Sequence, residues 1–194
     1  MTENPLQPPP WLNAPPVGEY PFEETHDLRA GPNLNDALLS LLPFVGVWRG
    51  RGKGGYPTID DFDFAQEIRT SHDGRPFLFY ESRSWMIDAD DRPIRPTGRE
   101  VGWWRPAAGG DEVEMLMMSP TGIMELYFGK AESNPPRLEV ATDAVVRTPT
   151  AKEVRAGQRL FGIVEGALLY AFEMAAVGQP LQAHLSARLQ RVAG

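Results

Sequence analysis

From Gly46 to the end of the chain, apolar and polar positions follow the pattern of short β-strands. Segments rich in β-branched and aromatic residues alternate with turn signals such as His72-Asp73-Gly74. No long helical periodicity separates these segments, which favours an all-β fold, an antiparallel sandwich or barrel. The expected strands are 44–52, 62–70, 76–87, 99–105, 111–118, 122–129, 136–142, 151–155, 158–165, 167–176 and 181–192.

A short helix is expected just before this β-rich region. Asn33 or Asn35 suits the N-cap position, and Pro43 would end the helix. Helical spacing places Leu34, Leu38 and Leu42, together with Leu39, on one face. Such a short helix needs an apolar surface to pack on, so we expect it to cover one end of the barrel.

The first 33 residues differ from the rest of the chain because eight of them are proline. This composition disfavours regular structure and predicts a proline-rich N-terminal extension over 1–33, partly disordered, followed by a barrel domain over 34–194. Trp11, Tyr20 and Phe22 lie in the extension. Large aromatic residues are unusual in a wholly solvated tail, so packing against the barrel wall and disorder remain open alternatives.

Composition narrows the classes of function. The chain has 194 residues, a formal net charge of −7 and no cysteine. The absence of cysteine excludes disulfides, thiolate catalysis and cysteine-ligated metals. The negative charge argues against nucleic acid or an anionic membrane as the main partner. The longest apolar run, 37–48, is interrupted, and no signal-peptide pattern is visible, so we expect a soluble cytoplasmic protein.

The segment Gly46–Gly52 has the pattern G-x-W-x-G-x-G at the start of the β-rich region. A tryptophan between glycines suits the first strand of a small closed barrel, where the ring fills the floor and the glycines permit close backbone approach. The segment is no phosphate loop, because neither G-K-[ST] nor a strand–loop–helix context follows. No acid–base pair stands out among the scattered carboxylates.

The three histidines are the only possible imidazole ligands. His26 lies in the acidic extension, and His72 lies in a turn, where it is either a surface residue or a rim residue. His184 belongs to a segment in which Leu181, Ala183, Leu185, Ala187 and Leu189 alternate with polar residues. Alternation places His184 on the polar face. That face points to solvent in an ordinary barrel, or inward if the barrel holds a polar-headed cofactor.

Four ordered sequence elements resemble the nitrobindin family, haem proteins with a β-barrel similar to fatty-acid-binding proteins. The resemblance covers roughly residues 36–193 and leaves the proline-rich extension outside it. Its elements are Gly46–Gly52, Gly55-Tyr56-Pro57-Thr58-Ile59, Pro149-Thr150-Ala151-Lys152-Glu153, and Val177-Gly178-Gln179-Pro180-Leu181 followed by His184-Leu185. It implies an antiparallel barrel of about ten strands, of the calycin type, that binds haem b.

The resemblance also assigns site residues. His184 falls on the position of the axial iron ligand, and Thr58 and Lys152 fall where the family contacts haem. An ammonium group at the mouth suits a haem propionate. His72 is a weak candidate for the distal side. Candidates for the cavity lining are Phe77, Phe79, Met115, Met117, Phe128 and Phe172.

The implied activity is haem-dependent isomerisation of peroxynitrite to nitrate at a histidine-ligated ferric iron, with reversible binding of NO. The alternatives are a non-enzymatic NO sensor or haem carrier, a fatty-acid-type binder of lipophilic ligands, and an interaction protein that uses the proline-rich extension. The leucines opposite His184 suggest a homodimer, because exposed apolar stripes usually have a partner.

Overall fold

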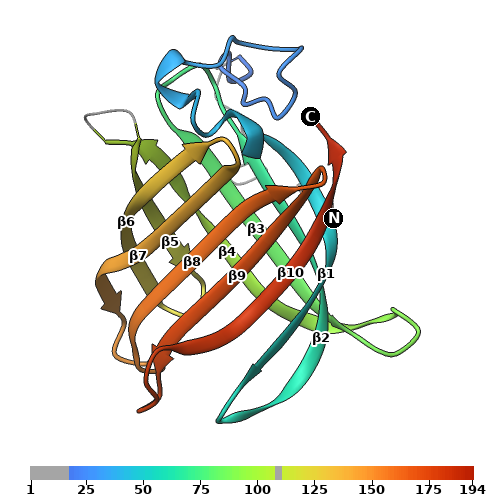
Figure 1. Ribbon diagram of the computed structural model, residues 1–194, viewed down its shortest axis with the longest axis vertical. Helices are drawn as coiled ribbons and strands as arrows, with labels where there is room; N and C mark the ends of the chain where they lie inside the picture. Colours follow the sequence, from blue (N-terminus) through green and yellow to red (C-terminus); the bar gives the residue numbers. More distant parts are fainter. Residues whose placement is uncertain (1–17, 108–110) are drawn as a thin grey trace, which may run out of the picture.

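The computed structural model describes residues 18–107 and 111–194, and ten antiparallel strands in it form a closed barrel (Figure 1). Each strand pairs with its neighbours in sequence, and β1 also pairs with β10 to close the barrel. The strands are β1 (Gly46–Tyr56), β2 (Ile59–Ser71), β3 (Leu78–Ile87), β4 (Pro93–Pro106), β5 (Glu112–Ser119), β6 (Ile123–Ser133), β7 (Pro136–Arg147), β8 (Val154–Val164), β9 (Ala167–Ala176) and β10 (Gln182–Ala193).

This architecture confirms the all-β antiparallel barrel, although several strands are longer than expected: β1 extends to Tyr56, β4 begins at Pro93 and β7 extends to Arg147. The expected segments 151–155 and 158–165 form a single strand, β8, instead of two. Inward side chains fill the barrel with one continuous core that includes Trp104, Tyr127 and Phe161. In the part of the chain that the structure describes, no helix is long and apolar enough to cross a membrane.

The expected short helix is wrong. Two three-residue 3₁₀ turns, η2 (Asp36–Leu38) and η3 (Leu42–Phe44), stand in its place. Asn35 does cap the first turn, since its side chain accepts a hydrogen bond from the Ala37 N–H. The cap is confirmed, but Pro43 interrupts the helix before a second full turn can form. Leu38, Leu41 and Phe44 are the residues that become buried, while Leu39 and Leu42 stay exposed.

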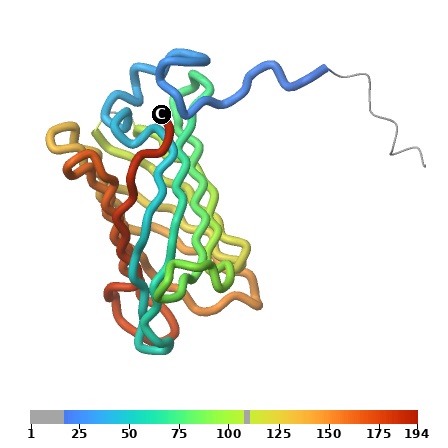
Figure 2. The backbone as a smooth tube through the Cα atoms, turned by 90° about the vertical axis from the view of Figure 1, so that its right-hand side faces the viewer, coloured from blue at the N-terminus to red at the C-terminus, as the bar shows by residue number. Residues whose placement is uncertain are grey.

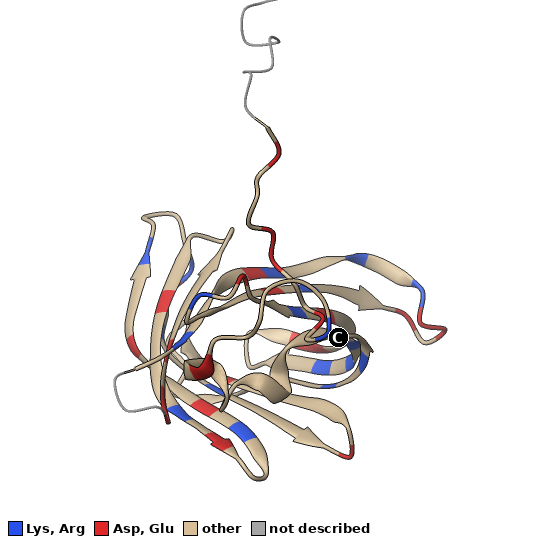
Figure 3. Cartoon of the chain, turned by 90° about the horizontal axis from the view of Figure 1, so that it is seen from above, with Lys and Arg blue, Asp and Glu red and all other residues tan. Residues whose placement is uncertain are grey.

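These turns cover one end of the barrel, which we call the closed end. Segment 25–45 lies across this opening, whereas the first described residues extend away from the barrel, and the C-terminus ends beside the opening (Figures 2 and 3). Trp48 is fully buried here and donates its indole N–H to the Phe44 carbonyl at 2.8 Å. The Arg191 guanidinium stacks 4.2 Å from the Trp48 ring and donates to the Pro43 and Val45 carbonyls. The expected role of Trp48 in filling the barrel floor is therefore confirmed.

The glycines of β1 allow the close approach that the sequence predicted. A Cβ atom on Gly50 would lie 2.1 Å from the Arg188 carbonyl oxygen of β10. Any side chain at this position would push β1 and β10 apart and open the barrel at its seam. The expectations for Trp11 and for the rest of residues 1–17 lie outside the described residues. Tyr20 and Phe22 are described, and both are exposed.

Candidate functional site

The open end of the barrel, opposite the closed end, brings together the loops that hold the expected site residues. The β1–β2 turn, the β7–β8 loop and the β9–β10 turn all lie here (Figure 1). The Tyr56 hydroxyl accepts the Ala176 N–H at 3.0 Å, which ties β1 to the end of β9. The Val177 N–H donates to the Glu153 carbonyl at 3.0 Å, which ties the β9–β10 turn to the β7–β8 loop.

His184 lies at an irregularity of β10. Ala183 pairs with Glu173 and Leu185 pairs with Phe172, so His184 is an extra residue without a partner on β9. A bulge of this kind interrupts the strict alternation of faces and re-aims a side chain. After the bulge, Ala187 and Leu189 are buried in the barrel, whereas Ser186 and Arg188 are exposed. His184 therefore reaches the cavity although its strand keeps the ordinary apolar-inward pattern.

This arrangement corrects two expectations from the sequence. The default placement of His184 on the solvent face is wrong, and so is the alternative in which the whole polar face of the strand turns inward. The leucine stripe that suggested a homodimer lies largely inside the barrel: Leu189 is fully buried and Leu185 packs against the core. The inward leucines are therefore not available to a second subunit, whereas Leu181 at the start of the stripe stays exposed.

The His184 imidazole is held by one hydrogen bond and two aromatic rings. Its Nδ1 lies 3.0 Å from the Gly55 carbonyl oxygen, which can only accept, so Nδ1 carries the proton and Nε2 keeps its lone pair. The rings of Tyr56 and Phe172 pack edge-on, with centroids 5.6 Å and 5.9 Å from the imidazole. Burial lowers the pKa of His184, although the bond to Gly55 opposes this effect, and the neutral ligand form is favoured.

A cavity of about 780 Å³ opens beside His184, where β1 diverges from β10. Its volume lies within the range of small-molecule and cofactor sites, which are mostly apolar with few polar groups. Lys53, Asp61 and Asp63 lie at the exposed rim, and Lys53 pairs with Asp63 at 3.0 Å. The other lining residues are Gly54, Gly55, Tyr56, Pro57, Phe62, Met86, Ile87, Ala183, His184, Leu185 and Ser186.

These residues fit a haem group. A metal-bound histidine usually donates its other ring N–H to a carbonyl or carboxylate, and the His184–Gly55 pair has this form. A single imidazole beside a cavity with both apolar and polar side chains suits a group that brings its own four equatorial ligands. Among residues 18–107 and 111–194, no cluster of three or more His, Asp or Glu side chains offers a site for a bare metal ion.

Thr58 and Lys152 lie at the same end as His184 but not in contact with it. Thr58 is exposed in the turn between β1 and β2, three residues after Gly55. Lys152 is exposed on the β7–β8 loop, next to Glu153, which accepts hydrogen bonds from the β9–β10 turn. Both residues lie at the open end of the barrel on loops far apart in sequence, and neither is among the residues that line the cavity.

His72 lies at the closed end, at the far end of β2 from the cavity. Its side chain is 1% exposed, and its backbone forms a bridge with Thr25 of the N-terminal segment. A position on the distal side of the cavity is therefore wrong, because the length of the barrel separates His72 from His184. The surface-turn alternative is wrong as well, since the N-terminal segment covers the residue.

None of the residues expected to line the cavity is among its lining residues, although Phe172 packs beside His184. Met115 and Met117 lie in the barrel core instead. Phe128 is 44% exposed on the outer wall, and Phe79 packs against Trp103, which is also partly exposed. Sequence reasoning missed Tyr56 as a ring against His184. It also missed the buried residue Arg159, although alternation with Gly157 and Phe161 on β8 indicates an inward position.

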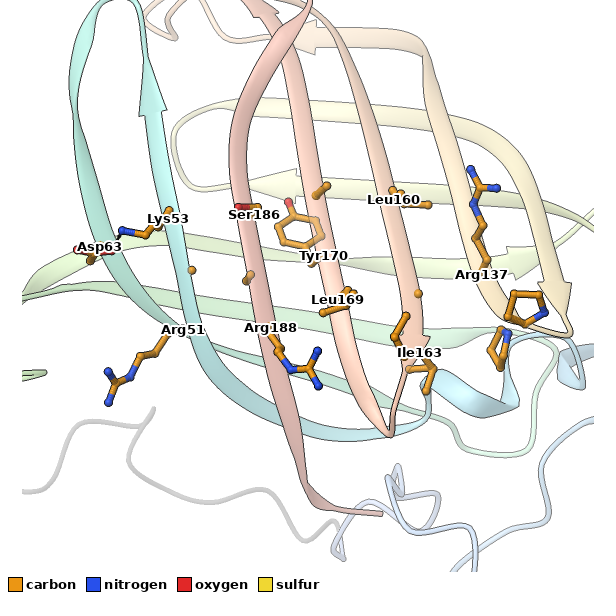
Figure 4. A pocket seen from close by; sticks show the side chains of 17 residues that line it. Arg51, Lys53, Asp63, Arg137, Leu160, Ile163, Leu169, Tyr170, Ser186 and Arg188 are labelled. Carbon is orange, nitrogen blue, oxygen red and sulfur yellow. Dashed lines mark hydrogen bonds and ion pairs between the residues drawn. The ribbon is translucent and has the colours of Figure 1, made fainter.

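A second concavity, of about 770 Å³, lies on the outer wall of β1 and β7–β10 (Figure 4). Its floor includes Leu160 and Leu169, and it contains no histidine. Its rim arginines are neutralised, since Arg188 pairs with Glu165 and Arg51 with Asp91. We place the candidate site at His184, because of these two cavities only that one includes an imidazole with an available ring nitrogen, beside the apolar side chains of Phe62 and Met86.

Comparison with known proteins agrees with this geometry. The family model described as "THAP4-like, heme-binding beta-barrel domain" matches residues 37–191. A protein of Salinispora tropica named peroxynitrite isomerase is 71% identical, with 99% of this chain and 98% of that protein covered. A protein of Saccharopolyspora erythraea named ferric nitrobindin-like protein is 47% identical over 94% of this chain and 86% of its own.

A solved structure shows the same fold. Rv2717c from M. tuberculosis superposes with a TM-score of 0.75 at 38% sequence identity, covering 82% of this chain and 99% of that one. The family model spans almost the whole described barrel, and the relatives match over nearly their full lengths. The chain thus belongs to the THAP4-like haem-binding β-barrel family, the nitrobindins.

Proposed function

We propose that this protein binds haem b and isomerises peroxynitrite to nitrate. The observation that supports this most directly is the His184 imidazole, whose Nδ1 is bonded to Gly55 and whose Nε2 is available beside the cavity. The relative from Salinispora tropica named peroxynitrite isomerase, 71% identical over nearly the whole chain, supports the choice of reaction. Reversible binding of NO at the same site belongs to the proposal.

In this proposal His184 is the axial ligand and the residue that acts at the reacting centre. Ferric haem, when bound, supplies an iron with an open coordination position at which peroxynitrite rearranges. Gly55 keeps the Nδ1 proton in place, so that Nε2 stays a donor of electrons. Tyr56 and Phe172 restrict rotation of the imidazole. The apolar side chains of the cavity, such as Phe62, Met86 and Leu185, offer a surface to the haem ring.

Thr58 and Lys152 are proposed to contact the polar edge of the haem at the mouth. The Lys152 ammonium would pair with a propionate, and the Thr58 hydroxyl would donate to a propionate or to the rim backbone. Their position at the open end, on loops tied to the β9–β10 turn, supports this role. We also keep residues 1–33 as an extension outside the haem domain, and the cytoplasmic location remains a prediction from composition.

An absorption titration with hemin tests the cofactor. The purified protein is expected to develop a Soret band with one hemin per chain, and His184→Ala is expected to lose it. His26→Ala is the matched control, because His26 lies in the N-terminal segment at the closed end and should leave the band unchanged. A wild-type protein that takes up no hemin contradicts the proposal.

Stopped-flow decay of peroxynitrite tests the reaction. The hemin-loaded protein is expected to accelerate decay beyond free hemin at equal concentration and to yield nitrate. If the loaded protein is no faster than free hemin, the isomerase is excluded and a haem carrier or NO sensor remains.

A further inference from the structure

A fully buried arginine lies inside the barrel beneath the candidate site. Arg159 of β8 is 1% exposed, and all five of its N–H groups have acceptors. Nη1 and Nη2 bind the Glu100 carboxylate at 2.8 and 2.6 Å, and Nη2 also donates to Glu125 at 3.3 Å. Nε donates to the Tyr127 hydroxyl at 2.9 Å, and Nη1 donates to Tyr170 at 3.2 Å.

This set of contacts fixes the plane of the guanidinium. Burying a charge without partners is energetically costly. A rotation of the guanidinium that breaks any of these hydrogen bonds is therefore opposed. Burial opposes the charge of Arg159, but Glu100 and the surrounding hydroxyls keep its pKa well above the usual value. Burial raises the pKa of Glu125, and one of its oxygens, Oε1, has no partner among the described residues. Glu100 is therefore the principal counter-ion.

The fixed guanidinium faces an aromatic ring that contacts His184. The Cζ atom of Arg159 lies 4.3 Å from the centroid of the Phe172 ring, the distance of a cation–π contact. Phe172 lies beside Arg159 across the β8–β9 pairing and beside Leu185 across the β9–β10 pairing. Its ring therefore bridges the buried cluster and the bulge that carries His184, with 5.9 Å to the imidazole.

The two rings beside His184 are anchored in different ways. The Tyr56 hydroxyl is bound to the backbone of β9, so this ring has a polar anchor of its own. Phe172 has no polar atom, and its face rests on Arg159. We infer that Arg159 is a positioning residue, which holds Phe172 against His184 and so fixes the imidazole for iron. The inference rests on the proposed haem function.

Charge alone does not explain the arrangement. Apart from burial and the Gly55 bond, Glu100 raises the pKa of His184 and Arg159 lowers it, so the two partners oppose each other. We therefore look to the fixed position of Arg159, which acts on His184 through its contact with Phe172. A variant that keeps the positive charge but loses the planar guanidinium should therefore still loosen Phe172 and the His184 imidazole.

The test uses Arg159→Lys, Phe172→Leu and the double variant in the full chain. Each single variant is expected to raise the hemin dissociation constant about threefold to tenfold. The double variant should be no weaker than the weaker single variant, because both changes interrupt one path. Phe161→Leu is the control for loss of a buried ring of β8. Phe161 packs against Trp104 and Tyr170, so its loss should lower hemin affinity less than Phe172→Leu does.

A second measurement needs no haem. The chain has three histidines, so their ring ¹⁵N signals are readily assigned. The signal that disappears in His184→Ala belongs to His184. In the apoprotein, Arg159→Lys and Phe172→Leu are expected to move the pKa of His184 up toward its ordinary value, since a looser ring admits water. If Arg159→Lys fails to fold, Tyr127→Phe removes one acceptor from Nε and is expected to give a smaller shift in the same direction.

The outcomes are separable. A wild-type protein without hemin uptake contradicts the proposed function, and the imidazole signal then still tests the path through Phe172. Folded variants with unchanged His184 signals and unchanged hemin affinity would overturn the inference. Additive effects in the double variant, or an equal loss in Phe161→Leu, would also overturn it, because Arg159 would then not act through Phe172.

Discussion

The two ends of the barrel each bury a histidine, and they use it in opposite ways. His184 at the open end has one ring nitrogen bonded to Gly55 and the other directed to a cavity. His72 at the closed end is almost fully buried, and neither ring nitrogen has a partner among the described residues. Burial is therefore not what makes a ligand. The difference is that the tautomer of His184 is fixed by a hydrogen bond and that its other ring nitrogen faces a cavity.

The surroundings differ in the same way. At the closed end, η2, η3 and segment 25–35 cover the opening, and Trp48 and Arg191 join the cover to the strands. At the open end, β1 diverges from β10 after Gly54. The loops that connect the strands there surround the opening. Stability is thus expected to reside at one end and ligand binding at the other.

Removing the Trp48 ring should give the largest effect on stability. Trp48→Ala is expected to lower the free energy of unfolding by about 3–5 kcal/mol, because it leaves a large cavity and removes the bond to Phe44. Urea unfolding measures this loss. Hemin affinity of the folded protein should stay near that of the wild type, and an equal loss of affinity would break the division between the ends.

Filling the space at Gly54 should act at the open end. A Cβ on Gly54 would lie 2.4 Å from Phe62 Cζ and 2.8 Å from Leu185 Cδ2, so both cavity-lining side chains must move. Gly54→Ala is expected to cost about 1–3 kcal/mol of stability and to weaken hemin uptake. Gly162→Ala is the control, since the added atom meets only the Pro136 oxygen at 3.8 Å. Equal hemin titrations for both variants would contradict the assignment of this cavity.

The closed-end histidine should make stability depend on pH. Burial lowers the pKa of His72, with Asp73 opposing. Between the lowered folded value and the ordinary value near 6.5, the unfolded chain binds more protons, so the free energy of unfolding falls as the pH drops through this interval. His72→Leu is expected to flatten this dependence in urea unfolding at a series of pH values. Since His184 is shifted in the same direction, part of the slope should remain.

Removing the exposed charge of Lys152 at the open end should have the smallest effect, a modest loss of hemin affinity. Lys152→Ala is expected to weaken hemin binding by less than about fivefold, and the effect should shrink with added salt, because an exposed ion pair contributes up to about 1 kcal/mol. Lys130→Ala is the matched control, an exposed lysine on β6 near the closed end. A loss of affinity in both variants would indicate a general effect of net charge.

Much of the molecule follows from local patterns in the chain. Alternation and turn residues determined the strands, and the absence of a helical period determined the all-β class. The same alternation placed Leu185, Ala187 and Leu189 on one face, and they do share it. Asn35 marked the cap of the first turn. These features depend on residues within a few positions of one another, so a sequence pattern is sufficient to find them.

The site depended on contacts that no local pattern contains. Alternation gives the face of a regular strand, but only the pairing with β9 shows that His184 is an extra residue, and this bulge turns the ring into the cavity. The Gly55 carbonyl that selects the tautomer is 129 positions away, and Glu100 is 59 positions from Arg159. The sequence by itself determined the all-β class, and its resemblance to the nitrobindins supplied the barrel and the candidate ligand. The pairing of β10 with β9 decided which way that ligand points, and closure of the barrel placed the Gly55 carbonyl beside it, because only closure brings β1 next to β10.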